Sequence, residues 1–318
     1  MLNLTKAELS EKAIELNFTR DTLEKALRLA EILTYLNTNP IMKDVLPLKG
    51  GTAINFTIFK LPRLSVDIDL DFHSTQTREE MLQSRTQITI DIETHMKTQE
   101  YTREISRKPS HSLEPLVFSY RNLGGSKDNI KIEINYSLRS HIFPLCIRSI
   151  NSELFDTSIR VLCLDPIEIF ASKINALINR AAARDLYDIH NMISFDILSE
   201  RDYELLRKAT IFYTAISQES IPNKYDFSKI EQISSRKIKT ELQPVIYKNE
   251  SISLESMKAK VVAFLSQLLT LSAEEDTFLT EFSNNNFLPE LLFEDEELLA
   301  RIRNHPMALW KTRAPGSK

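Results

Sequence analysis

Three aspartates spaced two residues apart stand out as groups that could do chemistry: Asp67, Asp69 and Asp71 in the stretch RLSVDIDLDF. The stretch alternates polar and apolar residues, which predicts a half-buried β-strand whose residues two apart point to the same face. Neighbouring same-face Cα atoms then lie about 6.6 Å apart, since a strand rises about 3.3 Å per residue. Two such carboxylates can converge on one divalent cation, and Mg²⁺ commonly binds one or two carboxylates together with substrate phosphates.

Other interpretations of this acidic strand compete with a metal site. An edge strand can expose carboxylates to discourage aggregation, although three consecutive outward aspartates are a poor use of that device. An EF-hand calcium loop is excluded, because Phe72 stands where that loop needs glycine. On the triplet alone, plain surface charge stays open.

A glycine pair lies upstream of the acidic strand. Gly50-Gly51-Thr52 follows the apolar VLPL and precedes the helix-like AINFTIF. Such a turn can present backbone N–H groups to phosphates at the start of a helix. A lone glycine pair is more often just a turn. Its combination with an Arg-x-Ser and an Asp-x-Asp between residues 50 and 71 is much more specific.

A second charged group lies on a helix that we expect to begin at Asp165, with Asp165 as its cap and Glu168 completing a capping box. If this helix continues unbroken, Lys173, Arg180 and Arg184 fall within about 40° of one another around its axis. A basic stripe backed by an apolar face could hold a triphosphate or an RNA backbone. The alternative is a solvated surface stripe, the usual fate of a charged helix face.

The elements that must position these groups follow from hydrophobic periodicity. We expect a helix over residues 19–37, a helix over roughly 76–98, and a β-hairpin in PLVFSYRNLGGSKDNIKIEINYSL with its turn at the glycine pair. Near residue 195 the character changes, and the chain beyond reads as helical. We therefore expect two domains, 1–195 and 196–318.

Composition bounds the classes of protein that remain. The chain has 318 residues with 42% hydrophobic and 26% charged, an ordinary globular composition, and only five glycines favour a mostly helical protein with one small sheet. The net charge of −4 means that a nucleic-acid partner must meet a local basic patch. Cys146 and Cys163 have no metal-ligand spacing, which fits a reducing cytoplasm, and no apolar run approaches the roughly 20 residues that span a bilayer.

The two motifs together resemble a known family. LKGGTAINF followed by RLSVDIDLDF resembles the first motif of the nucleotidyltransferase superfamily, and more narrowly that of the AbiEii/MenT toxins of type IV toxin–antitoxin and abortive-infection systems. The later K-x-x-A-x-x-x-R-x-x-x-RDLYD matches the same group. The resemblance covers about residues 46–72 and 165–192. It implies an α+β fold, with a polymerase-beta-like nucleotidyltransferase core, a small mixed sheet and a helical C-terminal half.

The resemblance also implies roles for individual residues. Asp67 and Asp69 would hold the metal ions, with Glu133 in IKIEINY as a third carboxylate from an adjacent strand; alternatively, Glu133 pairs with Lys131 on an exposed face. Either Asp185 or Asp188 would be a late acidic residue of the catalytic site. The residues expected to bind the nucleotide are Gly50, Gly51, Thr52, Arg63, Ser65, Lys173, Arg180 and Arg184.

The activity implied is Mg²⁺-dependent transfer of NMP from an NTP to RNA, first of all to the 3′ end of tRNA, which would block translation. Two Mg²⁺ ions and a cognate antitoxin encoded nearby would be the cofactor and partner. Two alternatives remain open on the sequence: NMP transfer to a hydroxyl of a protein, and a non-catalytic nucleotide-binding regulator.

Overall fold

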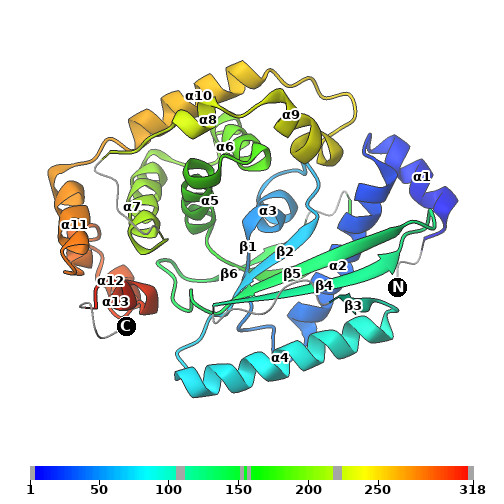
Figure 1. Ribbon diagram of the computed structural model, residues 1–318, viewed down its shortest axis with the longest axis horizontal. Helices are drawn as coiled ribbons and strands as arrows, with labels where there is room; N and C mark the ends of the chain where they lie inside the picture. Colours follow the sequence, from blue (N-terminus) through cyan, green and yellow to red (C-terminus); the bar gives the residue numbers. More distant parts are fainter. Residues whose placement is uncertain (1–3, 105–111, 151–153, 156–158, 218–223, 314–318) are drawn as a thin grey trace. The chain divides into compact units, whose positions relative to one another are not determined.

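The chain forms two compact units that are interleaved along the sequence (Figure 1). The computed structural model describes residues 4–104, 112–150, 154–155, 159–217 and 224–313. The first unit comprises residues 1–139, 145–164 and 244–250, and the second comprises residues 140–144, 165–243 and 251–318. This division differs from the expected boundary at residue 195. The helices from Asp165 onward belong to the second unit, while a short segment of the C-terminal half belongs to the first.

In its described residues, the first unit is built around a seven-stranded mixed sheet with the order β3-β4-β5-β2-β1-β7-β6. The strands are β1 (Leu48–Lys49), β2 (Asp67–Asp71), β3 (Thr102–Glu104), β4 (Leu113–Arg121), β5 (Lys127–Asn135), β6 (Cys146–Ser149) and β7 (Arg160–Cys163). β2 pairs antiparallel with β1 and parallel with β5, so it lies inside the sheet. The edge-strand explanation of its carboxylates is therefore excluded.

The helices of the first unit agree with the periodicity of the sequence. They are α1 (Lys6–Glu15), α2 (Arg20–Thr38), α3 (Gly50–Ala53), which continues as the π-helical η1 (Ile54–Ile58), and α4 (Arg78–Thr98). The helices predicted over residues 19–37 and 76–98 are confirmed as α2 and α4. The predicted hairpin is confirmed as β4 and β5, and Gly125 in its turn has the positive φ of 88° that favours glycine.

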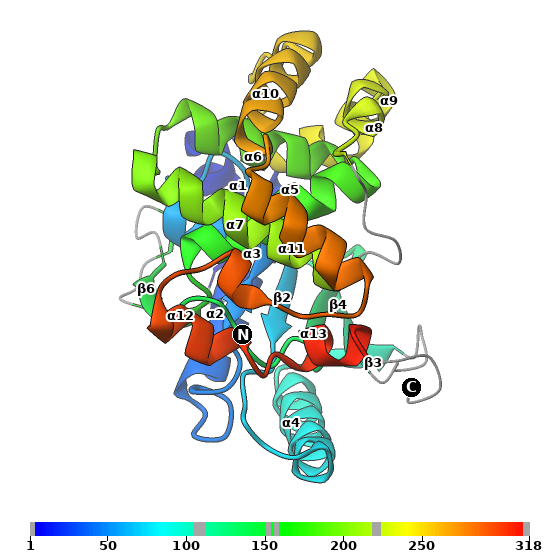
Figure 2. The same ribbon diagram turned by 90° about the vertical axis from the view of Figure 1, so that its left-hand side faces the viewer.

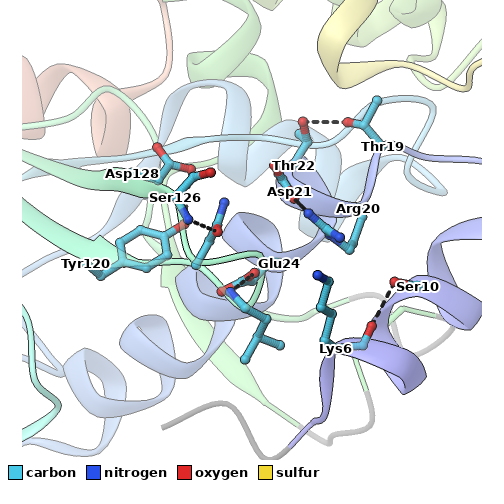
Figure 3. A network of polar contacts seen from close by, with 12 residues as sticks. Lys6, Ser10, Thr19, Arg20, Asp21, Thr22, Glu24, Tyr120, Ser126 and Asp128 are labelled. Carbon is cyan, nitrogen blue, oxygen red and sulfur yellow. Dashed lines mark hydrogen bonds and ion pairs between the residues drawn. The ribbon is translucent and has the colours of Figure 1, made fainter.

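Polar contacts fasten α2 to the β4–β5 hairpin (Figure 3). The buried carboxylate of Glu24 accepts a hydrogen bond from the backbone N–H of Leu123 at 2.9 Å, in the hairpin turn. The next residue of α2, Lys25, reaches Asp128 of β5 at 3.1 Å, and Asp128 also accepts from the Tyr120 hydroxyl at 3.2 Å. These contacts hold β5, the strand that carries Glu133, firmly in the first unit.

In its described residues, the second unit consists of helices and the segments that join them, without a strand (Figure 2). Its helices are α5 (Pro166–Arg180), α6 (Ala183–Ser194), α7 (Glu200–Ser217), α8 (Ser228–Glu231), α9 (Ser235–Lys237), η2 (Ile238–Leu242), α10 (Leu254–Leu268), α11 (Ala273–Ser283), η4 (Pro289–Leu291), α12 (Glu296–Ile302) and α13 (Pro306–Lys311), and the short η3 (Gln243–Val245) leads out of the unit. A mixed sheet with many helices confirms the predicted α+β class. Among the described helices, none has the length and apolar character needed to cross a membrane.

The basic stripe required a helix that continues unbroken from Asp165 through Arg184, and this condition is not met. α5 ends at Arg180, because Ala181 adopts a left-handed conformation with φ of 47°, and α6 starts at Ala183. A left-handed alanine costs about 1–2 kcal/mol, so tertiary contacts must stabilise the turn. Lys173, Arg180 and Arg184 therefore do not form a stripe on one helix.

The predicted capping box at the start of α5 is only half correct. Asp165 does cap the helix, since its carboxylate accepts from the N–H of Ile167 at 2.8 Å. Glu168, however, is fully buried and accepts instead from the backbone N–H groups of Ile142 and Phe143, at 3.0 and 3.2 Å. Burial alone would raise the pKa of Glu168, but these hydrogen bonds and the neighbouring His141 together lower it. Glu168 thus fastens residues 140–144 to the helical unit.

Candidate functional site

The aspartates of β2 share one face of the sheet, as their spacing predicts. Ile68 and Leu70 are buried between them, whereas Asp67 and Asp69 are only half-buried. Asp71 differs from the other two, because it is 1% exposed and forms an ion pair with Lys49 of β1. The triplet therefore divides into a buried, neutralised Asp71 and two carboxylates that solvent can still reach.

Glu133 lies next to these carboxylates on β5. The parallel register pairs Asp69 with Glu133 and Asp67 with Lys131, and paired residues of neighbouring strands place their side chains on the same face. Ile132 and Ile134 of β5 are fully buried on the opposite face, as predicted. Lys131 Nζ lies 2.6 Å from Glu133 Oε2, so the ion pair predicted as the alternative to a metal role is present. Glu133 as a metal ligand stays a prediction.

The side chains on this face suit a hard cation in their chemistry. Asp67 and Asp69 supply carboxylate oxygens on adjacent same-face positions, the donor type that Mg²⁺ prefers. In the described residues, no group of three or more His, Cys, Asp or Glu side chains is placed to hold a metal ion by itself. Asp67 and Asp69 thus fit the usual Mg²⁺ arrangement, in which two carboxylates share the ion with substrate phosphates.

Gly50 is in direct contact with this carboxylate group. It has a positive φ of 69°, and a Cβ atom built on it would overlap Oδ2 of Asp69. Both the backbone conformation and the space therefore require glycine at this position. Gly50 is also the first residue of α3, whose preceding cap residue Lys49 offers no side-chain hydrogen bond to the helix start. The predicted glycine turn and the predicted metal ligand are thus packed against each other.

Gly51 makes room for a buried arginine. A Cβ atom on Gly51 would come within 2.6 Å of Nη2 of Arg63 and 3.5 Å of Oγ of Ser65. Arg63 is only 2% exposed, and its Nη1 donates to the carbonyl of Leu64 at 3.0 Å. The Arg-x-Ser of the sequence therefore places a cation and a hydroxyl directly against the glycine turn.

Thr52 ties the turn to the carboxylate strand. Its side chain is fully buried, its Oγ1 lies 2.7 Å from Oγ of Ser65, and it also hydrogen-bonds the backbone carbonyl of Asp67. These contacts point inward, so in the structure Thr52 positions Ser65 and Asp67. A direct contact of Thr52 with nucleotide stays a prediction.

A segment from the C-terminal half of the sequence, residues 244–250, fastens the loop that carries Arg63; we call it the strap. The carbonyl of Val245 accepts from the N–H of Leu64 at 2.7 Å, and Arg63 forms an antiparallel bridge with Ile246. The Tyr247 hydroxyl donates to the carbonyl of Leu61 at 3.0 Å. Non-glycine residues rarely adopt the φ of 52° found at Leu61, so the strap holds this loop in a strained conformation.

The second group of predicted residues is brought together by the α5–α6 turn. Lys173 Nζ lies 2.9 Å from Asp185 and 3.2 Å from Asp188, and Arg180 reaches the other oxygen of Asp185 at 2.7 Å. Lys173, Asp185 and Asp188 are all buried. Arg184 lies on α6 and has contacts of its own. The structure thus makes Lys173 the centre of a buried ion cluster across the helix turn.

The charges of this cluster shift the titration of Asp185. Burial alone would raise the pKa of Asp185, but the charges of Lys173 and Arg180 outweigh burial and lower its pKa to about 2. The folded pKa is below the ordinary value, so Asp185 stabilises the fold at neutral pH and loses this effect as pH falls toward 2. Lys173 as a triphosphate ligand stays a prediction.

Two features of the site were not found in the sequence. Lys49 neutralises Asp71, and its position on the strand directly before the glycine pair, opposite Asp69, is a local signal that could have identified it. The strap has no such signal, because Tyr247 and Leu61 are 186 residues apart in the sequence.

Comparison with known proteins identifies the family to which the chain belongs. The family described as "Nucleotidyl transferase AbiEii toxin, Type IV TA system" matches residues 32–281, a range that includes the glycine turn, β2 and the α5–α6 cluster. The chain belongs to the AbiEii family. It is therefore an enzyme, a nucleotidyltransferase toxin of a toxin–antitoxin system.

A solved structure supports the fold of this AbiEii chain. The chain is similar to MenT4, a nucleotidyltransferase toxin from Mycobacterium tuberculosis H37Rv, with a TM-score of 0.64 and 16% sequence identity over 98% of this chain and 100% of that chain. At this identity the likeness is one of fold. Among the curated protein sequences, none matches the chain significantly.

The packing of Gly51 gives a first prediction. Gly51→Ala should displace the buried Arg63 and lower the free energy of unfolding by about 1–3 kcal/mol, the usual effect of overpacking, and it should also raise KM for the NTP. Gly124→Ala is the matched control, since its Cβ would come equally close, within 2.6 Å, to Nη2 of Arg20, a side chain that is 31% exposed and able to move. Thermal unfolding and steady-state kinetics check both variants; equal effects would contradict the structural account of Gly51.

The ion cluster gives a second prediction, on pH. Lys173→Met removes the cation that the two buried carboxylates share, leaves Arg180 on Asp185, and should destabilise the fold at pH 7 by about 3–5 kcal/mol. Burial then raises the pKa of these carboxylates, so they take up protons on acidification, and the deficit against the unsubstituted protein should shrink between pH 7 and roughly pH 4.5. Urea unfolding of both proteins at the two pH values measures this deficit. The control Lys173→Met/Asp185→Asn/Asp188→Asn should lack the pH dependence; a deficit that grows in acid would contradict the cluster.

Proposed function

We propose that this AbiEii-family toxin transfers NMP from an NTP to RNA in the presence of Mg²⁺, with the 3′ end of tRNA as the acceptor. The observation that carries the proposal is the contact between Gly50 and Asp69, which joins a turn suited to phosphate with a carboxylate suited to Mg²⁺. Blocking the 3′ end of tRNA would stop translation. A cognate antitoxin encoded nearby and a cytoplasmic location complete the proposal.

In this proposal the carboxylates bind Mg²⁺ and thereby orient the NTP. Asp67 and Asp69 hold Mg²⁺, with Glu133 as a third carboxylate once Lys131 turns away from it. Bound Mg²⁺ supplies stabilisation of the charge that develops on the transferring phosphate and lowers the pKa of the attacking hydroxyl. A bond forms between the acceptor hydroxyl oxygen and the α-phosphorus of the NTP, and the bond from that phosphorus to pyrophosphate breaks. The chain supplies positioning and charge, and needs no covalent nucleophile.

The triphosphate is assigned to the glycine turn and its neighbours. Gly50 and Gly51 are the first residues of α3, and no side chain caps the N–H groups at this helix start. Uncapped N–H groups at the start of a helix favour the binding of an anion. Arg63 adds a positive charge beneath Gly51, and Ser65 adds a hydroxyl beside it. The family resemblance further assigns phosphate contacts to Lys173, Arg180 and Arg184, and an acidic role to Asp185 or Asp188. Those assignments are proposals that rest on the resemblance alone.

The test is direct incorporation of label. We expect the purified protein, incubated with Mg²⁺, total RNA and one α-labelled NTP at a time, to label a tRNA-sized band with a preferred NTP. Asp67→Asn/Asp69→Asn should reduce the rate at least about 100-fold, since loss of a group that stabilises developing charge has effects of this size. The matched control Asp44→Asn/Asp276→Asn removes two exposed carboxylates and should keep the rate.

Three other outcomes would each contradict a different part of this proposal. Label that enters a protein band and survives nuclease would establish modification of a protein hydroxyl instead. Absence of any label, together with Mg²⁺-dependent NTP binding, would indicate a non-catalytic nucleotide-binding regulator. Equal labelling by the Asp67→Asn/Asp69→Asn variant would remove these carboxylates from the mechanism.

A further inference from the structure

Cations gather at the end of α5 in the second unit. We call them the α9 surface: Arg180, Lys229, Arg236, Lys237 and Lys239. Lys229 Nζ donates to the carbonyl of Asn179 at 3.1 Å, and Lys237 Nζ donates to the carbonyl of Ala181 at 3.1 Å. Because these two carbonyls flank Arg180, three cations from distant parts of the sequence converge on one turn. α8 packs against α5, and η2, which continues α9, packs against α6.

Capping explains only part of this surface. Lys229 and Lys237 neutralise carbonyls at the C-terminal end of α5, which is a common structural use of lysine. Arg236 and Lys239 are exposed, and neither side chain forms an ion pair within the described residues. The side chain of Arg180 is 64% exposed although it also reaches Asp185. Three cations therefore face solvent beyond what the helix end requires.

The local charge opposes the charge of the whole chain. Between residues 224 and 243 there are five Lys or Arg residues and three Asp or Glu residues, whereas the chain as a whole carries −4. Two of these acids are already engaged. Glu241 accepts from the N–H of Ala183 at 3.0 Å, and Asp226 accepts from the N–H of Ser228 at 2.9 Å. The net charge of the chain repels an anionic partner, but the local positive charge of this segment would attract it.

The lack of exposed apolar side chains indicates which kind of anion fits. The large hydrophobic side chains exposed in the described residues are Ile14, Ile41, Leu82, Ile90, Ile147, Phe195, Leu309 and Trp310. None of them lies in residues 179–184 or 224–243. A protein partner would need an apolar or aromatic core to its interface, and single-stranded bases would need aromatic stacking platforms. A phosphate backbone needs only cations.

We propose that the α9 surface binds the phosphate backbone of the RNA acceptor, away from its reacting end. This inference rests on the proposed function, because it takes RNA as the acceptor. The α9 surface is continuous with the ion cluster, since Arg180 forms an ion pair with Asp185 and Asp185 forms one with Lys173. Binding through the backbone would recognise an RNA helix irrespective of its sequence.

The test compares two double variants that remove the same charge from the same unit. Arg236→Ala/Lys239→Ala changes the α9 surface, and Arg201→Ala/Arg301→Ala removes two other exposed arginines. Binding of a fluorescein-labelled tRNA transcript is measured by anisotropy from about 50 to about 200 mM KCl. The α9 variant should bind about tenfold more weakly and lose about 1–2 from the slope of log K against log salt, whereas the control should keep both values. KM for the NTP and the Tm should stay unchanged in both.

The outcomes separate this inference from the proposed function. An α9 variant with the same RNA affinity and salt slope as the control would overturn the inference, even while the unsubstituted protein labels RNA. If the unsubstituted protein fails to label RNA in the transfer assay, the proposed function fails. The inference then fails as well, because it takes RNA as the acceptor, and the transfer assay rather than the binding assay reveals it.

Discussion

Electrostatic repulsion among carboxylates on one face of a central strand is the constraint that the first unit is built around. Asp67, Asp69 and Asp71 stand two residues apart on β2, and the register of β5 adds Glu133 beside Asp69. Lysines compensate the two outer members of the group, Lys49 for Asp71 and Lys131 for Glu133. Asp67 and Asp69 keep access to solvent, which is the arrangement that a cation-dependent phosphate chemistry requires.

The surroundings of β2 follow from this arrangement. Gly50 lacks a Cβ where Asp69 lies, Gly51 lacks one where Arg63 lies, and Thr52 links Ser65 to the carbonyl of Asp67. The strap then supplies hydrogen bonds to the loop before β2. A segment from the C-terminal half of the sequence thus stabilises the loop that carries Arg63 and Ser65.

The parts that sequence predicted are those set by local patterns. Alternation identified β2 and the shared face of its aspartates, and hydrophobic periodicity identified α2 and α4. The helix break at Ala181 could not be predicted, because alanine is the best helix former. The turn is imposed by residues far away in sequence, with Lys237 bound to the carbonyl of Ala181 and Glu241 bound to the N–H of Ala183. The strap escaped prediction for the same reason.

The central claim is that Asp67 and Asp69 repel each other, and that a divalent cation bound with its nucleotide offsets this repulsion. The most direct measurement is the Tm of the unsubstituted protein and of Asp67→Asn/Asp69→Asn, each with and without Mg²⁺ and a non-reactive NTP analogue. The account predicts that the variant has the higher Tm without ligand and loses the increase that Mg²⁺ and analogue give the unsubstituted protein. A variant that is less stable without ligand, yet gains the same increase from it, would contradict the account.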